Sequence, residues 1–132
     1  MKISQIIALI ATCTLAAAGV TAIASPVKAN PEEAQVFLKQ CYIIHHKLKD
    51  YQSAEAACTQ AISLHSEYAE AYLFRGGARL HLENYQGADA DFSRAAELFQ
   101  QQNNPEGYQT AQKLLGMSQD LQRKLRELNQ GR

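Results

Sequence analysis

Residues 69–102 decide the fold of this chain and read AEAYLFRGGARLHLENYQGADADFSRAAELFQQQ. A shift of 34 residues aligns them with residues 35–68, QVFLKQCYIIHHKLKDYQSAEAACTQAISLHSEY. Seven positions are identical in the two copies: Leu48/Leu82, Tyr51/Tyr85, Gln52/Gln86, Ala54/Ala88, Ala56/Ala90, Ala61/Ala95 and Leu64/Leu98. A fixed period of this length predicts stacked helical units, none of which buries its apolar face alone.

Apolar residues recur at helical spacing in five segments, and no segment alternates as a strand would. Asn30-Pro31-Glu32 can open the first helix, because Asn caps amide groups, Pro fits the first turn and an acid suits the helix dipole. Asn104-Pro105-Glu106 repeats this start, and the helix that follows carries a leucine stripe to about residue 129. We predict an all-α, right-handed α-solenoid of two helix–turn–helix repeats with a C-terminal capping helix.

The pattern resembles the tetratricopeptide repeat, a helix–turn–helix unit of 34 residues, in its short exported bacterial type. In the second copy the resemblance rests on Tyr72, Gly76, Tyr85, Ala88, Phe92 and Ala95. The first copy has Leu38, Tyr42, Tyr51, Ala54, Cys58 and Ala61 in these places, so Tyr42 replaces a glycine and Cys58 an aromatic residue. The resemblance covers two repeats, about 35–68 and 69–102, followed by a capping helix at 105–129.

Residues 1–29 have the layout of a secretory signal peptide. A basic tip precedes a long apolar stretch, and small-residue cleavage patterns end at Ala24 and Ala29. The alternatives are a membrane anchor formed by residues 3–23 and a lipoprotein linked through Cys13. We expect residues 30–129 to form one exported domain, in the periplasm, outside the cell or in the lumen of internal photosynthetic membranes if the host has them.

The charge of the expected mature chain is close to balanced. The full sequence has 13 basic and 13 acidic residues, and removal of residues 1–29 takes two lysines with it, which leaves a net charge near −2. This offers no electrostatic footprint for nucleic acid or anionic lipid. We therefore expect no nucleic-acid partner, and no membrane insertion after cleavage.

The sequence contains no recognisable catalytic motif. It has no Gly-x-Ser-x-Gly elbow, no glycine-rich phosphate loop and no His-Glu-x-x-His pair. His45 and His46 point about 100° apart on a helix, which favours surface or partly packed histidines over metal ligands. The residue types and spacing of Glu83, Asp89 and Asp91 indicate a turn and a solvated helix face rather than a paired catalytic acid and base. We expect no enzyme activity, cofactor or metal.

The resemblance implies a concave binding face lined by the first helix of each repeat. The candidate groove residues are Lys39, Gln40, Ile43, Leu73, Phe74, Gly77, Leu80 and His81. Lys39 matches one half of the family's carboxylate clamp, but Ile43 stands where its asparagine would be. The alternative is that this apolar face packs against the last helix.

A groove of this kind implies a non-catalytic module that binds a peptide or partner subunit, in the assembly of an envelope or membrane complex. One alternative is a structural protein that self-associates as a homodimer, through the groove or the last helix. Another is an accessory subunit that modulates an enzyme.

Cys41 and Cys58 remain after removal of the signal peptide and lie about equally far from the turn near Asp50. An even pair of cysteines in an exported small domain favours a disulfide. Packed helix axes are about 8–10 Å apart, so the geometry is demanding. The alternative is two reduced cysteines that act as small apolar fillers.

Overall fold

The computed structural model of the protein describes residues 30–131, and within this range no strand occurs. Its helical elements are α2 (Pro31–Ile43), the π-helical η1 (Ile44–Leu48), α3 (Tyr51–Leu64), α4 (Ala69–His81), α5 (Tyr85–Gln101) and α6 (Pro105–Gln130). The predicted all-α fold of two helix pairs and a capping helix is therefore confirmed. The signal-peptide prediction concerns residues outside the described part.

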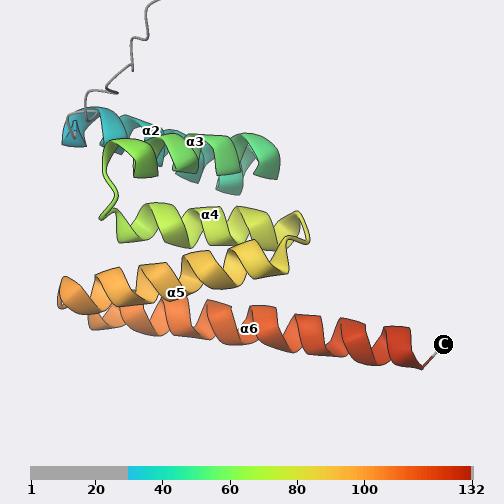
Figure 1. Ribbon diagram of the computed structural model, residues 1–132. Coiled ribbons are helices and arrows are strands. Elements are labelled where there is room, and N and C mark those ends of the chain that lie inside the picture. The colour runs from blue at the N-terminus through green and yellow to red at the C-terminus, as the bar shows by residue number, and fades with distance from the viewer. Residues whose placement is uncertain (1–29, 132) are drawn as a thin grey trace, which may run out of the picture.

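The helices stack in chain order, and each packs chiefly against the next one (Figure 1). Contacts also join α2 to α4 and α4 to α6, so these three helices lie along one face of the stack. The second half of α6 projects past the α4–α5 turn (Figure 1). Among the helices of residues 30–131, none has the length and hydropathy needed to cross a bilayer.

Three of the interhelical turns use the same backbone device. A residue with positive φ ends one helix, and an Asp or Asn caps the next by accepting the amide hydrogen three residues on. The residue pairs are Lys49-Asp50, Glu83-Asn84 and Asn103-Asn104. The second and third turns also close with a bond from the cap amide to the carbonyl oxygens of Arg79 and Phe99, at 2.8 and 2.9 Å.

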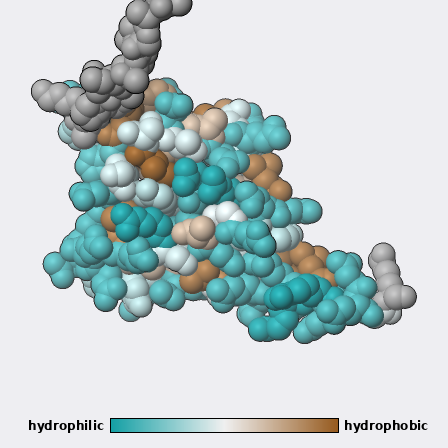
Figure 2. Space-filling model, in the orientation of Figure 1, coloured by the Kyte–Doolittle hydropathy of each residue, from teal (hydrophilic) through white to brown (hydrophobic). Residues whose placement is uncertain are grey.

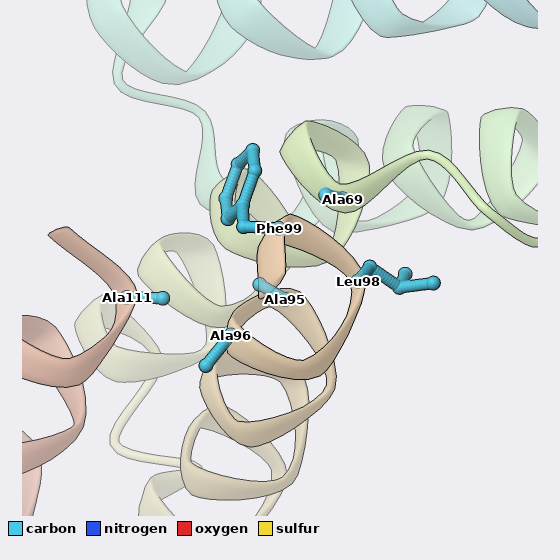
Figure 3. Close-up of a cluster of buried hydrophobic side chains, with 6 residues drawn as sticks. All are labelled: Ala69, Ala95, Ala96, Leu98, Phe99 and Ala111. Carbon is cyan, nitrogen blue, oxygen red and sulfur yellow. The ribbon is translucent and has the colours of Figure 1, made fainter. Parts of the chain in front are cut away.

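Small residues allow the helices to approach one another closely. A Cβ atom at Gly76 would lie 2.7 Å from Phe92 Cε1, and one at Gly107 would lie 2.5 Å from Phe99 Cδ1. Each glycine therefore leaves room for an aromatic ring of α5, which explains why α4 tolerates a glycine that weakens a helix. The larger core cluster joins α4, α5 and α6 through Ala69, Ala95, Ala96, Leu98, Phe99 and Ala111 (Figure 3).

A buried carboxylate joins the middle of the stack. Asp91 on α5 is only 3% exposed and accepts two hydrogen bonds from Arg75 on α4, at 2.7 and 2.9 Å. Arg79 also donates to Asp91 at 3.0 Å, and to Glu55 on α3 at 2.7 Å. The prediction that Asp91 belongs to a solvated face was wrong, because two arginines one turn apart on α4 compensate its charge.

Burial alone would lower the pKa of the Arg75 guanidinium, but its hydrogen bonds and attraction to Asp91 outweigh burial and raise that pKa overall. Arg75 also lies 3.3 Å from the Thr59 hydroxyl oxygen of α3, to which it donates. The network therefore connects α3, α4 and α5 through charged side chains.

The capping helix α6 is only partly covered by the stack. Ala111 and Ser118 are buried against it, whereas Met117, Leu121 and Leu128 are exposed. Gln122 donates to Asp89 on α5 at 2.8 Å, near the point where α5 begins. The apolar stripe predicted for α6 is therefore covered only in part, since Leu125 is half-buried and shares a hollow with Tyr85 and Gln86 of α5, whereas Leu128 near the end of the helix is exposed.

Removing the charge of Asp91 tests the network. We expect Asp91→Asn to lower the free energy of unfolding by about 3 kcal/mol, because two partly buried guanidinium groups lose their common partner. Asp120→Asn removes an exposed ion pair with Arg123 and should change it by less than about 0.5 kcal/mol. Urea denaturation of both variants measures the difference. Equal effects would contradict a structural role for the buried pair.

The left-handed turn at Glu83 gives a second prediction. Glycine adopts φ of 60° without the steric cost of a Cβ, so Glu83→Gly should stabilise the protein by about 0.5–1 kcal/mol. The control is Ala90→Gly, on the exposed side of α5, which should destabilise it by about 1 kcal/mol. Thermal unfolding followed by circular dichroism measures both. A lower midpoint for Glu83→Gly would contradict this account of the turn.

Candidate partner-binding groove

An open hollow of about 480 Å³ lies between α2 and α4. Its lining residues are Gln35, Leu38, Lys39, Tyr42, Ile43 and Phe74. Its walls are mainly apolar, and Lys39 supplies the one charge among the lining residues. Another hollow, of about 330 Å³, lies at the α5–α6 turn and is lined by uncharged turn residues and Tyr108.

Three of the eight predicted groove residues, Lys39, Ile43 and Phe74, line the hollow together. Leu73 instead packs against the core cluster formed by α4, α5 and α6. Gly77 lies under the His45 ring, where an added Cβ would be 3.1 Å from Nε2.

The remaining three predicted residues also lie outside the lining. Gln40 is exposed on α2, Leu80 is half-buried, and His81 stacks on Tyr51 with ring centroids 4.0 Å apart. The hollow is therefore concentrated at the first repeat, since five of its six lining residues belong to α2.

Sequence reasoning missed Gln35, Leu38 and Tyr42 as groove residues. The resemblance assigned Leu38 and Tyr42 to helix packing, but Tyr42 is 48% exposed. The available signal was the pair of departures from the repeat pattern. Where the second repeat has Gly76 beneath Phe92, the first has Tyr42 and Cys58. The large and small residues are thus exchanged, and the aromatic ring faces the hollow instead of filling the seam.

A disulfide fills the interface between α2 and α3, the two helices of the first repeat. Cys41 on α2 and Cys58 on α3 form a disulfide, with Cα atoms 5.2 Å apart, and both are fully buried. Ile44 and Phe74 pack against this pair and Ala57. Phe74 therefore contacts the disulfide cluster and also forms part of the wall of the hollow.

Aromatic rings and imidazoles extend from the hollow toward the α2–α3 turn. Tyr42 contacts Phe74, with ring centroids 5.5 Å apart, and His46 lies 4.6 Å from Tyr42 and 5.8 Å from Phe74. His45 then contacts His46 at 4.7 Å. The hollow and the histidines of η1 are thus parts of one continuous cluster.

The His45 ring is enclosed by three elements. It lies 5.4 Å from Tyr51 at the start of α3 and 5.8 Å from His81 on α4. Both of its nitrogens are buried and have no hydrogen-bond partner of good geometry among the described residues. Burial lowers the pKa of the His45 imidazole below its usual 6.5, and nearby His46 and His81 lower it further, against a smaller opposing effect of the Gly77 backbone.

Within residues 30–131, no group of three or more histidine, cysteine or acidic side chains is arranged to hold a metal ion. The side chains that line the hollow offer a ligand apolar contact, hydrogen bonding by Gln35 and one positive charge, that of Lys39.

No protein-family profile matches the chain. The chain is similar to RNA polymerase II-associated protein 3 of Xenopus laevis, with 48% identity over 52 residues, which covers 39% of this chain and 8% of that protein. It is also similar to the Homo sapiens protein of that name, with 32% identity over 77 residues, which covers 58% of this chain and 11% of the relative. The chain thus spans about a tenth of the length of the curated relatives it matches.

Reduction of the disulfide should weaken the first repeat. The two cysteines are 17 residues apart in sequence, and opening a loop of this size costs about 3 kcal/mol in the chain-entropy model. We expect a lower melting midpoint with reductant, and no reductant effect in the Cys41→Ala/Cys58→Ala variant. Mass spectrometry after thiol alkylation checks the bond itself. Two free thiols in protein made in an oxidising compartment would contradict it.

Proposed function

We propose that residues 30–131 form a non-catalytic tetratricopeptide-type module that binds another protein through the hollow between α2 and α4. The observation that carries the proposal is an apolar hollow of about 480 Å³ walled by outward-facing Tyr42 and Ile43, the latter 49% exposed. Exposed apolar walls of this kind are typical of binding grooves. The RNA polymerase II-associated relatives support the same class, because their name describes association with another protein.

The lining of the hollow also indicates the chemistry of the partner. Its volume suits one or two large apolar side chains, as presented by one face of a helix or by alternate residues of an extended peptide. Lys39 forms no ion pair with another described residue, so a carboxylate next to the apolar anchor would complement it. The proposed ligand is an apolar segment with an adjacent Asp or Glu.

The proposal includes export of the protein, and a partner in an envelope or membrane complex. Its support is the signal-peptide layout of residues 1–29, together with the Cys41–Cys58 disulfide, which is favoured in oxidising compartments. Expression of the full chain followed by cell fractionation tests this part. A reduced protein that stays in the cytoplasm would overturn it and leave the groove proposal standing.

Self-association through α6 is the second candidate function. Met117, Leu121 and Leu128 are exposed on this helix, and one of several hydrophobic areas visible on a mainly hydrophilic surface lies by its second half (Figure 2). A stable dimer usually buries more than about 1,200 Å² in total, which these few side chains do not readily supply. Light scattering decides between the candidates, because a dimer lost in Leu121→Ser/Leu128→Ser would favour α6.

A displayed library of random helical peptides tests the groove. We expect selected peptides to share an apolar residue within one turn of an Asp or Glu, and Ile43→Ser to weaken their binding about tenfold because it removes apolar contact. The control is Met117→Ser on α6, which changes a side chain of similar exposure, 53%, outside the hollow. Titration calorimetry measures both.

Circular dichroism keeps the test specific, because both variants should retain the helical signal and melting midpoint of the parent protein. Equal losses of peptide binding in Ile43→Ser and Met117→Ser would overturn the hollow as the binding site. Selection of no peptide at all would overturn the proposed ligand class.

A further inference from the structure

We propose that η1 acts as a pH-sensitive support for the hollow: protonation of His45 displaces η1 from α4 and weakens partner binding. This inference rests on the proposed function for its binding consequence. Its structural half concerns the isolated protein and can be tested without any partner.

His45 lies in an enclosed site. Its ring is held between η1, the start of α3 and α4; both nitrogens are buried and neither has a hydrogen bond of good geometry, although the Gly77 backbone lies close enough for a weak one. The neutral ring fits this site, where it fills space against aromatic neighbours and the bare backbone of Gly77. A charged imidazolium needs a hydrogen-bond acceptor at each nitrogen or contact with water, and burial without either is unfavourable.

The side chains around the His45 ring determine the charge that a protonated imidazole would meet. The titratable groups that face it are His46 on η1, Tyr51 on α3 and His81 on α4, and none of these carries a negative charge. The carboxylate of Asp50 lies nearby in sequence, but its two oxygens accept from the amide and hydroxyl of Ser53 at 3.1 and 2.6 Å. A cation at His45 would therefore meet two further imidazoles and no compensating acid.

The element that moves in this proposal is η1. The first helix of the second repeat, α4, ends in an α-helical turn closed by the Asn84 amide, whereas the first helix of the first repeat ends in the π-helical η1. Single π-helical turns are rare and are frequently found at functional sites, and no residue of η1 is fully buried. Such a segment can rearrange at lower cost than the rest of α2.

The side chain of His46 connects η1 to the hollow. His46 neighbours His45 in η1 and contacts both Tyr42 of α2 and Phe74 of α4, two residues that line the hollow. When η1 leaves α4, these contacts are lost and the walls are no longer held together. The competent form of the hollow becomes less populated, and the apparent affinity for a ligand falls in the same proportion.

The direction of the pH effect follows from the lowered pKa of His45. The unfolded or opened chain takes up a proton more readily than the closed state does. The stabilising effect of the closed site is therefore complete above about pH 6.5 and is lost as the pH falls from there toward the lowered value. Neutral pH favours the bound state, and acid favours release.

The structural half is tested on the disulfide-bonded protein alone. Hydrogen exchange followed by NMR at about pH 7.5 and about pH 5, corrected for the intrinsic pH dependence of exchange, should show selective loss of protection in η1 at the lower pH. His45→Phe keeps an aromatic ring of similar size without a titratable group and should abolish the change. His45→Leu serves the same purpose if the phenylalanine variant is destabilised. His65→Phe, at the end of α3, should leave the change intact.

The binding half uses a peptide selected by the displayed library at neutral pH. We expect its affinity to fall by about fivefold or more between the two pH values for the parent protein and His65→Phe, and to stay constant for His45→Phe. Exchange protection in η1 that does not change with pH would overturn the switch. A change in η1 with constant peptide affinity would overturn its link to the hollow, whereas failure to select any peptide would overturn the proposed ligand class and leave the pH response of η1 standing.

Discussion

The stack depends on one buried carboxylate. Asp91 contributes a negative charge to the inside of α5, and this charge is tolerated because Arg75 and Arg79 approach it from the same face of α4. Since Arg79 also binds Glu55, the charged network fixes the position of α3 relative to the second repeat. Such a network specifies which faces meet, because any other rotation of α4 would leave ions buried without partners.

Around this polar centre, the seams between helices are set by pairs of large and small residues. The second repeat places a phenylalanine of α5 against a glycine of α4, as at Phe92 and Gly76. The first repeat reverses the sizes, so that Cys58 lies inside and Tyr42 outside. The disulfide to Cys41 then fills the seam that the missing aromatic ring would have filled. One exchange of sizes thus accounts both for the sulfur bridge and for the aromatic wall of the hollow.

The same exchange explains why the candidate site lies on the first repeat. An aromatic ring released from the seam lies next to Phe74, which itself packs on the disulfide cluster. The histidines of η1 extend this contact toward α3 and α4. Stability of the first repeat and the shape of the hollow are therefore carried by the same few side chains. The hollow thus shares its supporting side chains with the disulfide cluster and with the histidines of η1.

The sequence by itself determined the local features of the protein. The Asn-Pro starts of two helices and the Asp or Asn caps after Lys49 and Glu83 act over a few neighbouring residues, so these helix starts were predictable. The period of 34 residues predicted the stacking of two similar helix pairs. Tertiary structure alone decided which polar residues are buried. Asp91 and Asp89 look alike along the chain, and only the approach of α4 makes one of them an internal ion. The hollow likewise depends on the contact between Tyr42 of α2 and Phe74 of α4, which the neighbours of either residue in sequence do not indicate.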